Sequence, residues 1–414
     1  MRLLIVGGKL QGTEAVYLAA KAGWETVLVD RREAPPAAGL ADRHVVADIA
    51  ADESRARTLV TTCDAVLPAC EDMATLEWLA ARVPAWGVPL LFDLDAYRVS
   101  QSKRASQRLF ADLDVPRPLP WPACGFPAVV KPDVASGSEG VAVVADAAEL
   151  AAALARLAAA GHEPLIEEYV AGPSLSLEVL AWGGHAVALQ VTGLEFDATY
   201  DCERVVAPVG EAEAGGPAAA GPGGSCAWAH AVAPGALAAF DAAAVRLAVG
   251  LGLNGLMDVE VMAPGPEPKV LEIDARLPSQ TPTAVFWSSG LNIVELLLET
   301  ARRAAPPTVE RAPRRACVYQ HVRARDGLLE VAGEHVMGSA APLQLVKGFF
   351  GVDEALTDYR RGARAWAATL IATGADVDEA RARADEAVGE LARRERIDVV
   401  PEADGPAGTK ATRP

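Results

Sequence analysis

Apolar runs alternate with helical patterns over the first hundred residues. Four runs have the length and composition of buried strands, and they lie at residues 3–6, 26–30, 64–69 and 88–92. A glycine-rich turn at 7–12 follows the first run, and a helical pattern covers 13–22. Strands that alternate with helices are typical of a parallel sheet covered on both faces. The pattern therefore predicts an α/β, Rossmann-like domain at the start of the chain.

The first turn also allows a dinucleotide-binding interpretation. Its glycines at 7, 8 and 12 depart from the G-x-G-x-x-G spacing, and Lys9 and Leu10 occupy the turn that a pyrophosphate must approach. A nicotinamide-dependent oxidoreductase therefore stays a distant alternative. The carboxyl ends of parallel strands also bind other ligands, so Glu71 and Asp72, just after the third run, are candidate contacts.

The pattern changes after residue 100. A helix is expected up to Phe110, and after a proline-rich connector a short apolar strand ends near Lys131. A loop of small residues at 133–140 then leads into a second strand. Backbone N–H groups of such a loop can close over phosphates, with the lysine beside them. The residues expected at the tip of this flap are Ser136, Gly137 and Ser138.

A further strand is predicted after the helical pattern at 147–160. It covers 164–170 and ends in Glu-Glu-Tyr-Val, whose backbone could present carbonyl and N–H groups to an adenine edge. Another strand, 175–181, follows a short glycine–proline turn. An ordinary flexible hairpin is the alternative interpretation of the flap.

The strongest chemical signal is a pair of acid-bearing strands. Asp258 and Glu260 lie two apart in one apolar run, and Glu272 and Asp274 lie two apart in the next. Side chains two apart project from one face of a strand, and the proline- and glycine-rich segment between the runs predicts a turn. We expect a β-hairpin with at least three converging acids and Arg276 on the same face. Such carboxylates suit Mg²⁺, whereas a solvated edge hairpin would need no ligand.

The rest of the chain carries fewer signals. Residues 205–236 are rich in glycine, proline and alanine and predict a mobile or disordered loop. Helical patterns follow at 241–250 and 290–302, and short strands and a helix near 378–393 are expected beyond them. The predicted divisions are 1–100, 101–181, 182–303 and 304–400, with a flexible tail at 401–414.

Composition and charge argue against several kinds of partner and site. The 414 residues carry a formal charge of −17, which argues against a nucleic-acid partner because nucleic acids require a basic surface. The six cysteines lack the spacing of a zinc site or a disulfide framework. No signal peptide or membrane-spanning run is evident in the sequence, so a cytoplasmic protein without a membrane partner is expected.

Four separated motifs occur in order: Lys103 near the start of a helix, Lys131 before the small-residue loop, the Glu-Glu-Tyr-Val strand end at 167–170, and the Glu-x-Asp-x-Arg strand at 272–276. This succession resembles the ATP-grasp superfamily of carboxylate–amine ligases over roughly residues 1–300. Within it, residues 7–12 and 272–282 are most similar to the 3-methylornithine–lysine ligases of pyrrolysine biosynthesis. Those enzymes join the carboxyl group of 3-methyl-D-ornithine to the side-chain amine of L-lysine and convert ATP to ADP and phosphate.

The resemblance implies a fold and a set of residue roles. The fold is an N-terminal Rossmann-like domain, a central nucleotide-binding subdomain, and a C-terminal grasp subdomain with a small α+β tail. Contacts to ATP are implied for Lys9, Lys103, Lys131, Ser136, Gly137, Ser138, Glu167, Glu168, Tyr169, Val170, Ser176 and Glu178. Contacts to the amino-acid substrates are implied for Leu10, Gln11, Glu71, Asp72, Asp258, Arg276, Ser279 and Thr281. Magnesium ions are implied at Glu260, Glu272 and Asp274, and catalytic roles at Lys131 and Arg276.

One position departs from the superfamily pattern. Ser174 stands where many members carry a ribose-binding acid, so the ribose contact stays open, with Glu178 as a candidate. The implied reaction runs through an acyl phosphate and needs no protein nucleophile. Other ATP-grasp ligases or carboxylases, D-ornithine in place of its methylated form, and a homodimer stay open as alternatives.

Overall fold

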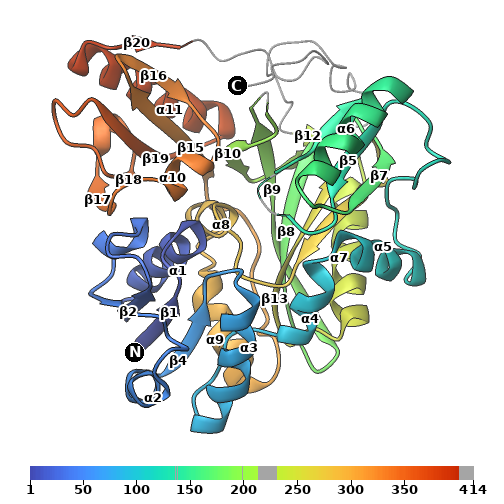
Figure 1. Cartoon of the computed structure of the whole chain (residues 1–414). Helices are drawn as coiled ribbons and strands as arrows, with labels where there is room; N and C mark the ends of the chain where they lie inside the picture. Colours follow the sequence, from blue (N-terminus) through green and yellow to red (C-terminus); the bar gives the residue numbers. More distant parts are fainter. Residues whose placement is uncertain (136, 138, 198, 213–230, 401–414) are drawn as a thin grey trace.

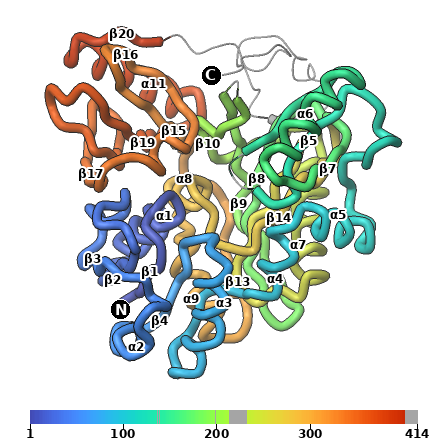
Figure 2. Tube along the Cα trace, viewed as in Figure 1, coloured from blue at the N-terminus to red at the C-terminus, as the bar shows by residue number. Residues whose placement is uncertain are grey.

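The computed structural model describes residues 1–135, 137, 139–197, 199–212 and 231–400. The predicted flap residues Ser136 and Ser138, much of the glycine-rich segment and the tail at 401–414 lie outside these ranges. Figures 1 and 2 show three groups of elements around the centre of the molecule. These groups are the N-terminal domain, a small sheet next to α6, and the C-terminal strands.

The N-terminal domain is the expected α/β unit. Its four parallel strands have the order β3-β2-β1-β4, and Leu3, Leu4 and Ile5 of the central strand β1 are completely buried. A Cβ on Gly12 would come within 2.1 Å of the Gly7 carbonyl oxygen, so this glycine serves packing inside a helix that already begins at Leu10. The elements are β1 (Arg2–Val6), α1 (Leu10–Lys21), β2 (Glu25–Asp30), a 3₁₀ turn (Pro36–Gly39), β3 (Arg43–Val46), α2 (Glu53–Thr61), β4 (Ala65–Pro68), α3 (Met73–Arg82) and a 3₁₀ turn (Pro84–Trp86).

One local prediction for this part is wrong, and one helix was not predicted. The apolar run at 88–92 forms only an isolated bridge between Leu90 and Val66, because Pro89 has no N–H to continue a ladder. The helix expected from residue 100 to Phe110 is confirmed as α5 (Lys103–Asp112), and a separate helix, α4 (Leu94–Ser100), precedes it. The Ser102 hydroxyl accepts the N–H of Ala105 and caps the second helix.

A three-stranded antiparallel sheet, in the order β6-β5-β7, forms the second part. Helix α6 covers it with Leu150, Ala153 and Leu157, whose spacing of three and four residues places them on one face. The strands at the flap and at the Glu-Glu-Tyr-Val segment are thus confirmed. The elements are β5 (Ala128–Pro132), β6 (Ala142–Val144), α6 (Ala147–Ala159) and β7 (Pro164–Glu168).

A long sheet with the order β14-β13-β8-β9-β10-β15-β19-β18-β17 connects the rest of the chain. Because β10 pairs with β15, the C-terminal strands continue the sheet that carries the acid hairpin. Strand β10 begins at Cys202, so the prediction of a loop from residue 205 is wrong at its start, where Val205 and Val206 are buried. None of the helices in the described ranges is long and apolar enough to cross a membrane.

The elements of this third part are β8 (Ser174–Trp182), β9 (His185–Phe196), β10 (Cys202–Ala207), β11 (Gly210–Glu211), β12 (Ala231–Val232), α7 (Ala236–Leu251), β13 (Gly255–Met262), β14 (Lys269–Asp274), α8 (Thr281–Ser289), α9 (Ile293–Arg303), β15 (Ala316–Arg325), β16 (Leu328–Val331), α10 (His335–Gly338), β17 (Gln344–Lys347), a 3₁₀ turn (Phe349–Gly351), β18 (Glu354–Thr357), β19 (Ala365–Gly374), α11 (Val377–Glu395) and β20 (Asp398–Val399).

Candidate active site

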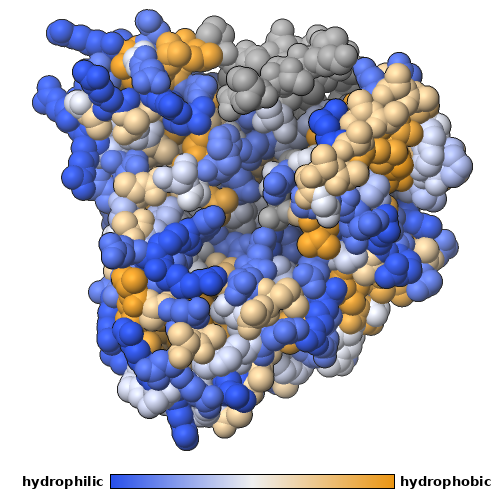
Figure 3. All heavy atoms as spheres, viewed as in Figure 1, coloured by the Kyte–Doolittle hydropathy of each residue, from blue (hydrophilic) through white to orange (hydrophobic). Residues whose placement is uncertain are grey.

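A cavity of about 300 Å³ lies where the three parts meet. Figure 3 shows a hollow at the centre of this face, with largely hydrophilic residues around it. Glu71 comes from the N-terminal domain, Lys103 from α5, Gly137 and Glu139 from the flap, and Glu334 from the segment before α10. The acid hairpin supplies one wall, so the cavity is closed only when distant parts of the chain come together.

The predicted acid hairpin is confirmed, and its register orders the acids in two rows. Glu260 lies opposite Glu272, and Asp258 lies opposite Asp274. Strand β8 adds Ser176 opposite Glu260 and Glu178 opposite Asp258. Residues directly opposite on neighbouring strands share a face of the sheet. We call Ser176, Glu260 and Glu272 the outer row, and Glu178, Asp258 and Asp274 the inner row.

The outer row is only partly neutralised by lysine. Lys103 Nζ lies 3.2 Å from Glu272 and also donates to the carbonyl oxygen of Ala135 at 2.7 Å. Burial alone would raise the pKa of Glu272, but the charges of Lys103 and Lys131 hold it below its ordinary value. Burial and the neighbouring Glu272 carboxylate raise the pKa of Glu260 to about 8. Glu272 is thus paired with Lys103, whereas Glu260 has no ion pair among the described residues.

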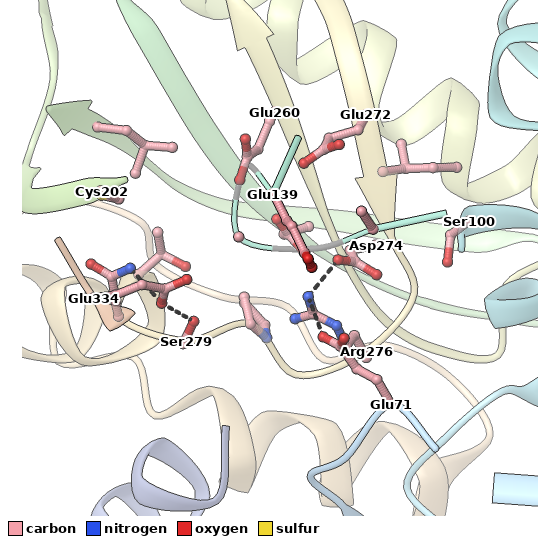
Figure 4. A pocket seen from close by; sticks show the side chains of 18 of the residues that line it. Glu71, Ser100, Glu139, Cys202, Glu260, Glu272, Asp274, Arg276, Ser279 and Glu334 are labelled. Atoms are coloured by element: carbon pink, nitrogen blue, oxygen red, sulfur yellow. Dashed lines mark hydrogen bonds and ion pairs between the residues drawn. The ribbon is translucent and has the colours of Figure 1, made fainter. Parts of the chain in front are cut away.

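The inner row is paired at one end only. Arg276 binds Asp274 at 2.6 Å and Glu71 at 3.0 Å, as Figure 4 shows. Burial raises the pKa of Asp274 to about 6, although Arg276 opposes the shift. Asp258 and Glu178 have raised pKa values, mainly through burial, to about 7 for Glu178. Within the described chain, the Asp258 Oδ1 atom and both Glu178 carboxylate oxygens have no hydrogen-bond partner.

A strained turn holds the opposite side of the cavity. Gln280 has φ +74° and ψ −59°, and the N–H of Thr281 donates to the Ser279 carbonyl at 2.9 Å, which defines a γ-turn. Glu334 accepts hydrogen bonds from Ser279 Oγ and Gln280 Nε2, both at 2.7 Å. Such backbone strain persists only where surrounding contacts fix it, and it concentrates at functional sites.

The structure brings many of the sequence-predicted residues to the cavity but not all of them. Those that line it are Glu71, Lys103, Gly137, Asp258, Glu260, Glu272, Asp274, Arg276, Ser279 and Thr281. The other described residues of the prediction are not among those that line it: Lys9, Leu10, Gln11, Asp72, Lys131, Glu167, Glu168, Tyr169, Val170, Ser176 and Glu178. Sequence reasoning missed Tyr97, Ser100, Gln101, Glu139, Asp201, Cys202 and Glu334, which belong to no recognised motif.

The helix starts and contacts of the N-terminal domain explain where three of its predicted site residues lie. Asp72 caps α3 by accepting the N–H of Thr75, and it is not among the residues that line the cavity. Lys9 is exposed just before α1. Gln11 instead reaches the cavity indirectly, because its Nε2 donates to Glu71 at 2.9 Å.

The nucleotide-side residues also have partners within the chain. Lys131 and Glu167 form a buried ion pair at 2.5 Å, and Glu168 binds Lys269 at 2.7 Å. The N–H groups of Glu168 and Tyr169 donate to carbonyl oxygens of Leu119 and Pro127, respectively. These two N–H groups are therefore engaged by the preceding connector.

Comparisons with known proteins agree with this architecture. A family model described as "PylC-like, N-terminal domain" matches residues 3–91, and one described as "ATP-grasp domain" matches 101–280. The 3-methyl-D-ornithine–L-lysine ligase of Methanosarcina barkeri is 35% identical over 338 residues, which are 81% of this chain and 83% of that protein. The chain belongs to this ligase family. It is an ATP-dependent carboxylate–amine ligase, and the nicotinamide-dependent alternative is wrong.

Solved structures show how widely the ligase fold recurs. The ADP complex of an N5-carboxyaminoimidazole ribonucleotide synthetase aligns with a TM-score of 0.66 at 16% identity, covering 95% of this chain and 97% of its own. An L-amino acid ligase from Bacillus licheniformis aligns with a TM-score of 0.64 at 17% identity, covering 94% and 97%. These likenesses confirm the predicted ATP-grasp fold.

The donor set of the ligase suits magnesium without forming a closed cage. Among the described residues, no group of three or more acid, histidine or cysteine side chains could hold a metal ion by itself. The reason is local, because Glu272 already faces Lys103 and Asp274 already faces Arg276. Magnesium needs only one or two carboxylates when phosphate oxygens and water complete its shell, and the unbalanced outer row offers them.

Proposed function

We propose that this ligase joins the carboxyl group of 3-methyl-D-ornithine to the side-chain amine of L-lysine, in pyrrolysine biosynthesis, with conversion of ATP to ADP and phosphate. The observation that carries the proposal is a cavity with two adjacent acid rows in a chain of this family. The outer row suits a metal–phosphate group, whereas the inner row suits a cationic amino acid. A neutral substrate would leave Asp258 of the inner row without an ion-pair partner.

Activation of a carboxylate in water requires a better leaving group than oxide. Transfer of the terminal phosphoryl group of ATP supplies one, and the amine then attacks the acyl phosphate and releases phosphate. Catalysis of this kind depends on positioning and on neutralising charge. No protein nucleophile is needed.

The chain's own residues have distinct tasks in this scheme. Lys103 and Lys131 hold the nucleotide phosphates, and the flap around Gly137 covers them. Glu260 and Glu272, with Asp274 beside them, would hold Mg²⁺, which supplies charge neutralisation at the phosphates when bound. Arg276 faces the reacting carboxylate, while Asp258 and Glu71 receive substrate ammonium groups.

The test is ADP release with D-ornithine or 3-methyl-D-ornithine, each with and without L-lysine. We expect ADP to form rapidly only when both amino acids and Mg²⁺ are present. Mass spectrometry of the product should show one amide bond between the two substrates. Turnover with D-alanine or other neutral amino acids in place of the ornithine would instead indicate a dipeptide ligase.

A further inference from the structure

His321 is a buried histidine whose two ring nitrogens both have partners. It lies on β15 and is 1% exposed. Its Nδ1 is 2.9 Å from the Thr369 hydroxyl on β19, and its Nε2 is 3.2 Å from the side-chain oxygen of Gln280. Tyr319, two residues earlier on the same strand, packs edge-to-face against the imidazole ring. The side chain thus connects the C-terminal strands to Gln280.

Gln280 is the centre of the strained turn that lines the cavity. Its side-chain Nε2 donates to Glu334 at 2.7 Å, and both Gln280 and Glu334 face the cavity. The amide therefore lies between His321 and Glu334, with one end toward each. A backbone with φ +74° at a residue other than glycine persists only where surrounding contacts hold it, and these two side chains are such contacts.

Glu334 sets the direction of every hydrogen bond in this chain of groups. Its Oε2 accepts both the Ser279 hydroxyl and the Gln280 amide, so the Gln280 oxygen faces His321. An amide oxygen can only accept, so Nε2 of His321 carries the hydrogen and Nδ1 accepts the Thr369 hydroxyl. Burial lowers the pKa of His321 to about 3, so the ring is neutral and has one donor and one acceptor. A single tautomer satisfies the whole chain.

The place of this chain in the molecule distinguishes it from ordinary core packing. His321 and Thr369 are directly opposite residues on β15 and β19, far beyond the acid hairpin in the sequence. The chain that starts there ends on two residues of the cavity wall. The C-terminal strands therefore reach the cavity through the Gln280 amide.

We propose that His321 is a positioning residue of the ligase, which holds the Gln280 amide and, through it, the turn at 279–281 and Glu334 in the geometry that ligation requires. This inference deepens the proposed function, on which its activity test rests. His321 is not among the residues that line the cavity, so it acts through Gln280. Without the Nε2 donor, the Gln280 oxygen would lose its partner and the amide could turn away from Glu334.

The experiment uses substitutions that keep different ends of the imidazole. His321→Gln keeps an N–H donor near the position of Nε2, whereas His321→Asn keeps an acceptor near Nδ1 and loses the donor. The matched control is Gln320→Leu. Gln320 is the neighbour of His321 on β15, is completely buried, and accepts the Arg204 Nε–H on the opposite face of the strand.

Activity is measured as ADP release with D-ornithine and L-lysine, and thermal unfolding is recorded for every variant. We expect kcat to fall about tenfold or more in His321→Asn and to stay within about threefold of the wild type in His321→Gln, because small displacements of positioning groups are costly in rate. The KM for ATP should hardly change. Gln320→Leu should unfold at a lower temperature with an unchanged kcat.

The tautomer of His321 is a readout that does not depend on turnover. Nitrogen chemical shifts of the full-length protein labelled at histidine distinguish the two neutral tautomers from the charged ring. The signal that disappears in His321→Gln identifies this residue. We expect the neutral Nε2–H tautomer from about pH 5 to about pH 8. The Nδ1–H tautomer or a charged ring would overturn the inference.

The possible outcomes separate the positioning role from the reaction. No ADP release from the wild-type enzyme with L-lysine and either ornithine substrate would contradict the proposed function and leave the tautomer to decide the positioning. Equal losses of kcat in His321→Gln and His321→Asn, in step with their stability, would overturn the positioning role alone. An equal loss in Gln320→Leu would also overturn it, because general loosening of β15 would then explain the effect.

Discussion

Two regions of this protein bury carboxylates in opposite ways. On β9, the Glu195 side chain is 5% exposed. Its carboxylate accepts hydrogen bonds from the guanidinium groups of Arg204 at 2.7 Å and Arg381 at 3.1 Å. Burial alone would raise its pKa, but the two guanidinium groups hold it below its ordinary value. On β8 and β13, Glu178 and Asp258 have no ion pair among the described residues, and burial raises the pKa of each, although the charge of Arg276 opposes the shift at Asp258.

The difference separates buried acids that have a guanidinium partner from buried acids that have none. The ion pairs of Glu195 join β9, β10 and α11, and removing one guanidinium group leaves a buried charge that is only partly compensated. An unpaired buried acid instead weakens the free protein and gains its partner when a cation binds. Burial of an acid therefore does not by itself show whether its pKa is raised or lowered; the cations next to it must also be known.

The largest expected effect concerns the paired region. Arg204→Leu should lower the free energy of unfolding by about 3–5 kcal/mol, because Glu195 and Gln320 lose a buried partner. Urea unfolding measures this change. The matched control is Arg325→Leu, which breaks an exposed pair with Asp326 and should have no measurable effect. A small loss in the Arg204 variant would mean that the network is not structural.

The next effect concerns the outer row. Glu272→Gln should reduce kcat for ADP formation by about 100-fold or more, because the metal–phosphate group loses a charged ligand. The far-ultraviolet circular dichroism spectrum should stay that of the folded wild type. Near-normal turnover at saturating Mg²⁺ would remove Glu272 from the metal site.

A smaller change is expected where substrate ammonium groups bind. Asp258→Asn and Glu71→Gln should each raise the KM for the ornithine substrate by about tenfold, since a charge-assisted hydrogen bond contributes about 1.5–3 kcal/mol. The KM for ATP should hardly change. Equal effects on both constants would place Asp258 with the metal ligands, and no effect would place the diamine elsewhere.

The smallest effect per measured step is a pH dependence with opposite signs in the two regions. The pKa values of Glu14 and Glu178 are raised to about 8 and about 7, so the folded state holds protons that the unfolded state has lost. The free energy of unfolding should therefore fall as pH rises from about 4.5 to about 8, by up to about 1.4 kcal/mol per pH unit for each group.

For Glu195 the sign is reversed. Its pKa is lowered, so its contribution to stability is present above its ordinary range and is lost as pH falls through its folded pKa. Urea unfolding across pH 4–8, without nucleotide or Mg²⁺, measures both trends. Glu178→Gln should flatten the slope between pH 5 and 8, and an unchanged slope would contradict the raised pKa.

Much of the architecture was predictable from local patterns. The strands at 3–6 and 164–170, helix α6 and the acid hairpin follow from periodicity and turn composition, because these act within a few residues. The strand predicted at 88–92 is wrong because apolar side chains alone do not provide the backbone hydrogen bonds of a strand. The position of Pro89 decided against a strand there.

The sequence by itself predicted that four acids share one face of a hairpin, because Asp258 and Glu260 lie two apart, as do Glu272 and Asp274, and the structure confirms that hairpin. Only the tertiary structure decided which acids are balanced. Strand β8 places Glu178 beside Asp258, and the segment before α10 brings Glu334 to the cavity. Electrostatic balance depends on distances between groups far apart in the chain, and no local pattern encodes those distances.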